Sequence, residues 1–135
     1  MAVEITGRYT GKLGMELTHG PSGAKLKTAA PVDNQGDGSS FSPTDLVAAA
    51  LGSCMVTTMG ILAEREGIDF TTASFHVEKH MAGDPRRIAR LPVRIHLPKS
   101  LTPEQRAKFE RAAHTCPVHR ALVPEVEKDV EFVYE

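Results

Sequence analysis

The stretch SPTDLVAAALGSCMVTTMGILAERE, residues 42–66, decides the fold of this chain. Ser42 is a favoured N-cap residue, Pro43 suits the first helical position, and Asp45 stands where a capping box places an acid. Gly67, which follows the stretch, is typical of the residue that ends a helix. The pattern therefore predicts one long helix whose two ends are both encoded in the sequence.

Residues 46–63 of this helix carry no charged side chain, so the helix has no polar face to give to water. A helix that is apolar on every side is buried in the middle of a fold. Its length would also span a bilayer. However, Gly52, Ser53 and Thr57 dilute its hydrophobicity, and it lacks basic flanks and aromatic belts. We expect a buried core helix and no membrane association.

The rest of the chain places strands and further helices around this helix. We expect short strands within residues 1–30, a loop over 31–42, a hairpin of strands over 69–80 and 88–97, helices over 102–113 and 118–126, the latter interrupted by Pro124, and a last strand over 129–134. Apolar and polar side chains alternate along 88–97, so one face of the hairpin is apolar and is expected to be buried. The order predicts an α+β fold with antiparallel sheet packed on helices.

A single layer of sheet covers only one side of an apolar helix, so something else must cover the other side. A second copy of the chain is the natural candidate. The 135 residues are of a length typical of one domain, residues 1–135. We therefore expect a single-domain protein that forms a homodimer.

Composition narrows the function classes. The net charge is −1 and the isoelectric point is near 6.6, which does not indicate nucleic-acid binding. The opening residues MAVEITGRYT lack the charged-then-apolar layout of a signal peptide, so a cytoplasmic location is expected. Cysteines in a cytoplasmic protein are more often catalytic or redox-active than part of a structural disulfide. The two cysteines are Cys54 and Cys116.

The two cysteines occupy different helix positions. Cys54 lies midway along the apolar helix, where a free cysteine commonly acts as a small core residue. Cys116 precedes Pro117 and is expected at the start of a helix, where the helix dipole and free N–H groups lower a thiol pKa. His114 and His119 are polar residues within reach of Cys116 in sequence.

Two thiols that lie close together in the folded protein are able to carry out a complete redox cycle. One thiolate attacks a peroxide oxygen and becomes a sulfenic acid, and the other thiol condenses with it to form a disulfide. A dithiol reductant then reopens the disulfide. The sequence supplies both thiols but does not by itself bring them together.

Two motifs in order resemble one known family. Residues 42–54, SPTDLVAAALGSC, resemble the central-helix motif of the OsmC family, the osmotically inducible protein C and organic hydroperoxide resistance group. Residues 116–119, CPVH, are similar to the Cys-Pro-x-Ser stretch that precedes the last strand of that family. The spacing between the motifs, the intervening hairpin and the final strand also match, so the resemblance covers essentially the whole chain.

The resemblance implies an OsmC-like fold, an intertwined homodimer with long central helices between sheets, and active sites at the dimer interface. It implies that Cys54 is the peroxidatic nucleophile and Cys116 the resolving thiol of a hydroperoxide peroxidase. A dithiol, such as that of a lipoylated protein, is the implied reductant, and neither a metal nor an organic cofactor is implied.

The chain departs from the family pattern at three positions. The peroxidase members carry a catalytic Glu directly after the helix-opening proline, whereas this chain has Thr44 there and its acid at Asp45. The family also has an activating arginine near the N-terminus, for which Arg8 is the best match. His119 replaces the usual serine. Asp45 and Arg8 are therefore the candidate supporting residues, with a capping box and a strand surface as their structural alternatives.

Two other functions remain open. His114, Cys116 and His119 are close in sequence and, with Cys54, would supply four metal ligands, although their spacing is not a standard zinc pattern. Alternatively, a pocket at the dimer interface would bind a fatty acid or another small apolar ligand without turnover.

Overall fold

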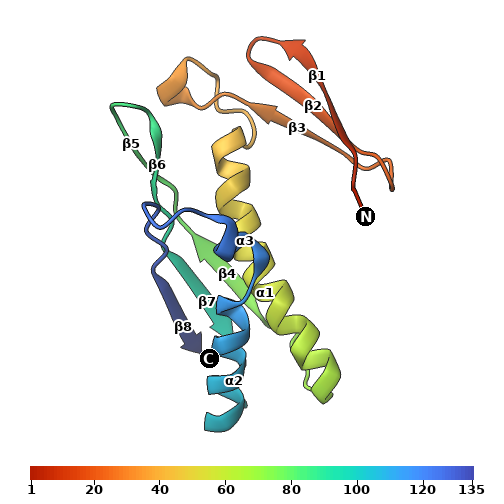
Figure 1. Cartoon of the computed structure of the whole chain (residues 1–135), viewed down its shortest axis with the longest axis vertical. Helices are drawn as coiled ribbons and strands as arrows, with labels where there is room; N and C mark the ends of the chain where they lie inside the picture. The colour runs from red at the N-terminus through yellow and green to blue at the C-terminus, as the bar shows by residue number, and fades with distance from the viewer. The chain divides into compact units, whose positions relative to one another are not determined.

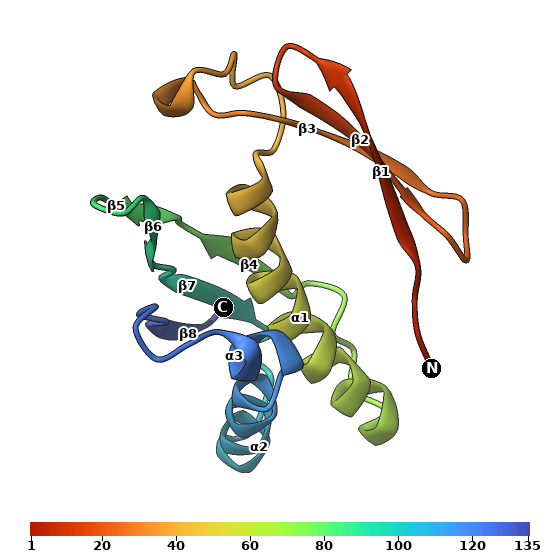
Figure 2. The ribbon, with the colours of Figure 1, turned by 45° about the horizontal axis from the view of Figure 1, so that its top comes forward.

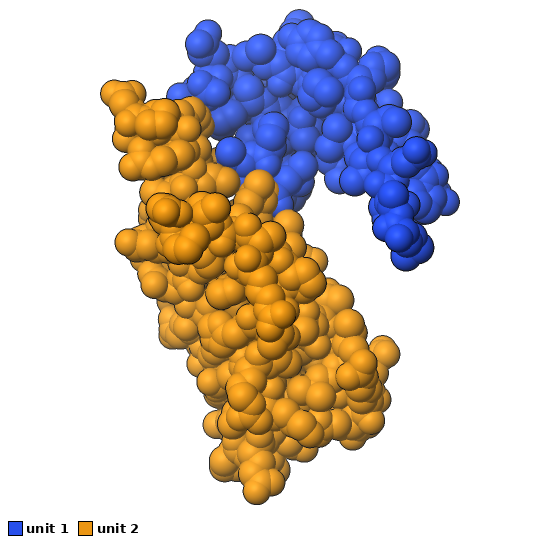
Figure 3. All heavy atoms as spheres, viewed as in Figure 1, with its two compact units in different colours: residues 1–46 blue, residues 47–135 orange.

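The computed structural model describes residues 1–135 and divides them into two compact units (Figure 3). The first unit is Met1–Leu46 and the second is Val47–Glu135. The single-domain organisation stays a prediction, and each unit is described by itself below.

The first unit is a three-stranded antiparallel sheet. Its strands are β1 (Ile5–Gly11), β2 (Gly14–His19) and β3 (Lys25–Ala29), in the order β1-β2-β3, followed by a short 3-10 turn, η1 (Val32–Asn34). The β1–β2 turn is tight, with left-handed backbone at Gly11, Lys12 and Leu13. The strands expected in the first part of the chain are therefore present.

The register gives this sheet one apolar face and one charged face. Tyr9 pairs with Met15, and Leu17 pairs with Leu26, so these side chains share a face. Arg8 pairs with Glu16, which in turn pairs with Lys27, on the opposite face. The apolar face is not covered by other residues of the first unit. Its exposed large residues are Ile5, Tyr9 and Leu26, which are 65%, 61% and 47% exposed.

The long helix α1 (Pro43–Glu66) begins and ends as the sequence predicts. At its start, the Ser42 N–H donates to Asp45 Oδ2 at 2.8 Å and the Asp45 N–H donates to Ser42 Oγ at 3.0 Å. These two bonds form the expected capping box, with aspartate in the acid position. At its end, Gly67 has φ of +66°, and the Ile68 N–H donates to the Ala63 carbonyl at 2.9 Å. This is the Schellman arrangement that terminates a helix.

Only one side of α1 is covered within the second unit. The buried side chains are Ala48, Leu51, Met55, Met59 and Ala63, which recur every three or four residues as expected for one helix face. By length and composition α1 is long and apolar enough to cross a membrane. In the structure, 33% of its most apolar window is buried. Ala50, Ser53, Thr57 and Ile61 form the exposed stripe of this helix.

The second unit contains a mixed sheet with the strand order β4-β7-β8. Strand β4 (Ser74–Val77) is antiparallel to β7 (Val93–Leu97), whereas β8 (Val130–Tyr134) runs parallel to β7. A separate hairpin is formed by β5 (His80–Ala82) and β6 (Arg87–Arg90). The β7–β8 pair therefore departs from a purely antiparallel sheet.

The predicted hairpin of 69–80 and 88–97 is wrong in its details. Asp69 Oδ1 accepts the Thr71 N–H at 3.0 Å, and this turn delays the first strand until Ser74. Pro92 has no N–H to donate to a ladder, and the second strand is split around it into β6 and β7. The remaining pairing, β4 with β7, keeps the predicted orientation.

Two short helices follow the sheet hairpins. Helix α2 (Pro103–His114) lies where the sequence predicts a helix, and it starts with a capping box between Thr102 and Gln105. Helix α3 (Pro117–Ala121) has Cys116 as its N-cap. The prediction that α3 extends to residue 126 is wrong, because Leu122 is already extended and a residue before a proline, here Val123, is disfavoured in a helix.

The core of the second unit lies between α1, α2 and one face of the sheet. Val93, Ile95 and Leu97 of β7 are buried, whereas Arg94 between them is exposed, so both helices pack on the same face (Figures 1 and 2). Phe109 of α2 is fully buried and its ring lies 5.6 Å from that of Phe70. Cys116 is a fully buried member of the same core.

Gly52 is the position where α1 approaches the sheet most closely. A Cβ atom at this position would lie 2.3 Å from Cδ2 of Phe75 on β4. This separation is shorter than carbon atoms tolerate, so the absence of a side chain at residue 52 sets the distance between α1 and β4.

We predict that Gly52→Ala lowers the free energy of unfolding by about 1–3 kcal/mol, because the added methyl group overpacks the contact with Phe75. Chemical denaturation monitored by circular dichroism measures the change. Gly60→Ala is the matched control on the same helix. Its Cβ would lie 3.9 Å from the nearest atom, so the helix propensity of alanine should stabilise the protein by up to about 1 kcal/mol. Equal effects of the two substitutions would contradict the packing argument.

Candidate functional site

Cys54 lies in the middle of α1 and is partly exposed. Its backbone carbonyl accepts a hydrogen bond from Thr58 Oγ1 at 2.8 Å, one turn further along the helix. Its side chain packs against the core that contains Cys116. Cys54 therefore sits at the boundary between the buried and exposed sides of α1.

Cys116 has no exposed surface. It is the N-cap of α3, in extended conformation, and its Sγ accepts the N–H of His119 at 3.2 Å. Pro117 at the first helical position has no N–H of its own to offer. The start of α3 therefore holds the sulfur through the backbone N–H of His119, and the N–H of Val118 is a smaller cause that also lowers the thiol pKa.

The structure brings the two thiols together. Burial raises the pKa of Cys116, and Cys54 raises it further, both through a hydrogen bond between the two side chains and through charge repulsion. The N–H of His119 acts in the opposite direction but does not offset these effects. Cys54 and Cys116 are both free thiols in this structure.

The expectation that Cys116 has a lowered pKa is wrong. It rested on the position of Cys116 at a helix start, and that position is correct. The helix has only five residues, however, and the sulfur is fully removed from water. Desolvation disfavours the charged thiolate, and here it outweighs the backbone N–H groups of His119 and Val118, which lower the pKa.

Two histidines flank Cys116 without forming a metal centre. The rings of His114 and His119 are 5.5 Å apart in an edge-on arrangement, and the His114 ring also lies 5.9 Å from that of Phe132. Burial lowers the pKa of His119, with His114 and Lys128 as smaller causes. No group of three or more His, Cys, Asp or Glu side chains in residues 1–135 is placed to hold a metal ion. This geometry does not support the alternative of a Cys–His metal site.

Asp45 and Arg8 both belong to the first unit, whereas the two cysteines belong to the second. The carboxylate of Asp45 is engaged in the capping box of α1. The guanidinium of Arg8 is exposed and pairs with Glu16 at 3.3 Å across the sheet. Asp45 is thus a capping-box residue and Arg8 is a strand-surface residue in this structure. Their catalytic roles stay predictions.

An apolar cavity of about 480 Å³ lies beside the second half of α1. Thr57 and Ile61 contribute to it from the helix, and Ile68 and Phe70 contribute from the loop that follows. Thr57 is three residues and Ile61 seven residues beyond Cys54, so all three share one helix face. Sequence analysis did not identify this cavity, because the loop residues that close it have no motif of their own.

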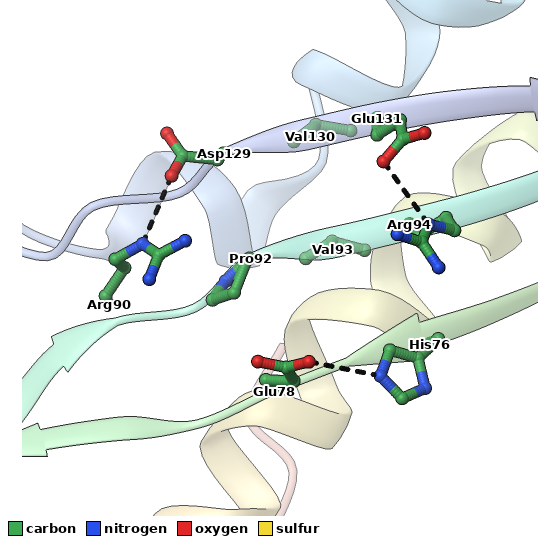
Figure 4. Close-up of a pocket in the computed structure, with 9 residues that line it drawn as sticks. All are labelled: His76, Glu78, Arg90, Pro92, Val93, Arg94, Asp129, Val130 and Glu131. Atoms are coloured by element: carbon green, nitrogen blue, oxygen red, sulfur yellow. Dashed lines mark hydrogen bonds and ion pairs between the residues drawn. The ribbon is translucent and has the colours of Figure 1, made fainter.

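A second hollow, of about 340 Å³, lies on the outer face of the β4-β7-β8 sheet (Figure 4). Its arginines are paired across strands: Arg90 with Asp129 at 3.3 Å and Arg94 with Glu131 at 3.2 Å. At its edge His76 faces Glu78 at 3.6 Å. The basic side chains that the sequence places in this region thus form surface ion pairs, which contribute little individually to stability.

Residues 36–131 of the chain match the protein-family model described as "OsmC-like protein". Among solved structures, a Psychrobacter arcticus protein ascribed to the osmotic stress induced and detoxification response is 38% identical, with a TM-score of 0.90 over 95% of this chain and 93% of that one.

Two more distant structures share the fold. The organic hydroperoxide resistance protein OsmC of Legionella pneumophila is 20% identical, with a TM-score of 0.73 over 98% of this chain and 97% of that one. OhrB of Bacillus subtilis, an organic hydroperoxide resistance protein, is 18% identical, with a TM-score of 0.67 over 98% of each chain. None of the curated proteins searched matches this sequence.

We predict that Cys54→Ala lowers the pKa of Cys116, because it removes the hydrogen bond and the charge repulsion that favour the thiol form. The pKa should stay above its ordinary value, since burial remains the largest cause. The rate of alkylation at Cys116, followed by mass spectrometry over a pH series, measures this change. A Cys116 pKa that is unchanged in the variant would show that the two thiols do not interact.

Proposed function

Since this chain belongs to the OsmC-like family, we propose that it is a thiol peroxidase that reduces organic hydroperoxides with Cys54 and Cys116. The observation that carries the proposal is the interaction between these two side chains, the only thiols in the chain. A neighbouring pair of free thiols is what a cycle through sulfenic acid and disulfide requires.

Exposure supports the assignment of the two roles. Cys54 is partly exposed and Cys116 is fully buried, so a peroxide reaches Cys54 first. Burial also keeps Cys116 in the thiol form, which is the state expected of a group that waits for its partner to react. Cys54 is therefore the proposed peroxidatic residue and Cys116 the resolving residue.

The proposed cycle has three balanced steps. The Cys54 thiolate attacks the terminal oxygen of the hydroperoxide, the O–O bond breaks, and an alcohol leaves with a proton. The Cys116 thiol then attacks the Cys54 sulfenic acid, forming the disulfide and releasing water. A dithiol reductant, either a small dithiol or a lipoyl-type one, returns both cysteines to thiols.

The apolar cavity beside α1 supports an organic substrate. Its lining includes Thr57, about one turn along α1 from Cys54, and Ile68 and Phe70, with Glu64 and Asp69 also on its wall. Such a cavity offers room for the hydrocarbon part of a hydroperoxide while the peroxide group lies at Cys54. The same cavity also favours the second candidate function, binding of a small apolar ligand without turnover.

We also propose that the protein is a homodimer. Two surfaces are left uncovered within their own units: the uncharged stripe Ala50, Ser53, Thr57 and Ile61 on α1, and the β1–β3 face that carries Ile5, Tyr9 and Leu26. Exposed apolar side chains that gather on one face are typical of an interface. The proposed roles of Arg8 as partner of the thiolate and of Asp45 beside it belong to this assembly.

We predict that the wild-type protein reduces cumene hydroperoxide with a dithiol as electron donor. Cys54→Ser should abolish turnover, because no thiolate remains to attack the peroxide. Cys116→Ser should allow one turnover to the sulfenic acid and then stop, because the disulfide cannot form. Coupled consumption of the peroxide measures turnover, and dimedone labelling followed by mass spectrometry detects the sulfenic acid.

Sustained peroxidase activity in the Cys54→Ser variant would rule out this assignment. Binding of cumyl alcohol to a wild-type protein that shows no turnover would instead favour the ligand-binding function.

We predict that Ile5→Arg converts the dimer to a monomer, because it places a charge within the β1–β3 apolar face. Thr6→Arg, next to it on the charged face of the same strand, is the matched control and should leave the dimer intact. Analytical ultracentrifugation measures the mass of each variant. A wild-type protein that sediments as a monomer at micromolar concentration would contradict the proposed assembly.

A further inference from the structure

The apolar cavity beside α1 has negative charge on its wall and no positive charge. Its large apolar side chains are Ile61, Ile68 and Phe70. Glu64 and Asp69 are the two ionisable residues that line it, and no lysine, arginine or histidine contributes to the wall. The cavity, of about 480 Å³, therefore has room for a hydrocarbon chain but offers no cation to an anionic ligand.

The wall of the cavity extends along α1 away from Cys54. Thr57 lies three residues beyond Cys54, which corresponds to about 4.5 Å along the helix axis. Glu64 lies ten residues beyond Cys54, or about 15 Å along the axis. Of the lining residues on α1, Glu64 is the most distant from Cys54 in sequence. An extended substrate that follows the cavity from a peroxide group at Cys54 therefore brings the other end of its chain toward Glu64.

Asp69 is a carboxylate held by hydrogen bonds at the cavity wall. Its Oδ1 accepts the Thr71 N–H at 3.0 Å and the Thr71 hydroxyl at 2.7 Å. The backbone hydrogen bond and then the side-chain one lower the pKa of Asp69, so the residue is negatively charged at neutral pH. Thr71 also lines the cavity, which places the carboxylate that it binds beside the cavity as well.

Glu64 is exposed, and the lysine that reaches this end of α1 pairs with a different acid. Lys108 Nζ of α2 lies 2.7 Å from Glu66 Oε2. Glu66 does not line the cavity. The positive charge of Lys108 is thus engaged outside the cavity, and the two acids of the wall define the charge that a ligand meets.

We propose that Glu64 and Asp69 determine the substrate class of the cavity: they exclude hydroperoxides that carry a carboxylate and leave uncharged organic hydroperoxides as substrates. This inference rests on the proposed function. A carboxylate in the cavity would lie among apolar side chains without a cation and close to two like charges, and both effects disfavour its binding. An ester or a plain hydrocarbon of the same length encounters neither effect.

The test compares linoleic acid hydroperoxide with its methyl ester, because the two share their chain and peroxide group and differ by one charge. Consumption of each, below the concentration at which it forms micelles and with a dithiol as electron donor, gives kcat/KM. The wild type should prefer the ester on the order of 10-fold. The preference should lie in KM, because repulsion remote from the reacting oxygen acts equally on ground state and transition state. It should also shrink as salt is added.

Glu64→Gln and Asp69→Asn should each raise kcat/KM for the acid about 3-fold, the order expected for removing one charge across water. The double variant should remove most of the preference, while kcat/KM for the ester stays unchanged. Glu66→Gln is the matched control, since it removes a charge from the same end of α1 but outside the cavity, and it should leave the preference intact.

A binding measurement tests the same inference without turnover. Calorimetric titration of the Cys54→Ser protein with decan-1-ol and with decanoate at neutral pH should show tighter binding of the alcohol. The double variant Glu64→Gln, Asp69→Asn should narrow the difference.

Equal kcat/KM for the acid and the ester in the wild type, or a preference that survives in the double variant, would overturn the inference. A preference that does not respond to salt would also overturn it, because it would come from shape and not from charge. Failure of the proposed function would look different: neither hydroperoxide would be consumed, while the alcohol would still bind more tightly than decanoate.

Discussion

The covering of helix α1 is the constraint on which the rest of this structure depends. The helix has no charge over residues 46–63, and its own chain buries only the side that carries Leu51, Met55 and Met59. The β7 strand and α2 pack on that side, and the absence of a side chain at Gly52 sets how closely β4 approaches. Because burial of apolar side chains is the main stabilising contribution to folding, the uncovered side is the strongest argument for a second subunit.

The same covering determines the chemistry of the cysteines. Cys116 belongs to the core that packs against α1, and Cys54 lies where the covered side of α1 meets the uncovered side. The Cys116 thiol is therefore excluded from water and the Cys54 thiol is partly exposed, although the two interact. This asymmetry supports distinct roles in a redox cycle.

Local interactions were the part of the fold that could be predicted. The capping boxes at Ser42 and Thr102 and the Schellman end at Gly67 depend on residues within one turn of each other, and all three are present. The predicted hairpin was wrong at the Asp69 turn and at Pro92, and α3 stops at Ala121, before the interruption expected at Pro124. The parallel β7–β8 pairing joins strands far apart in the chain, so periodicity carried no signal for it.

For the candidate site, the sequence by itself determined which residues carry reactive groups and which helix position each occupies: Cys54 within α1 and Cys116 at the start of α3. Only the tertiary structure decided that the two thiols interact, that Cys116 is fully buried and that its pKa rises rather than falls. The physical reason is desolvation. A helix position is a local property that a sequence motif encodes, whereas the removal of a sulfur atom from water depends on every element that packs around it.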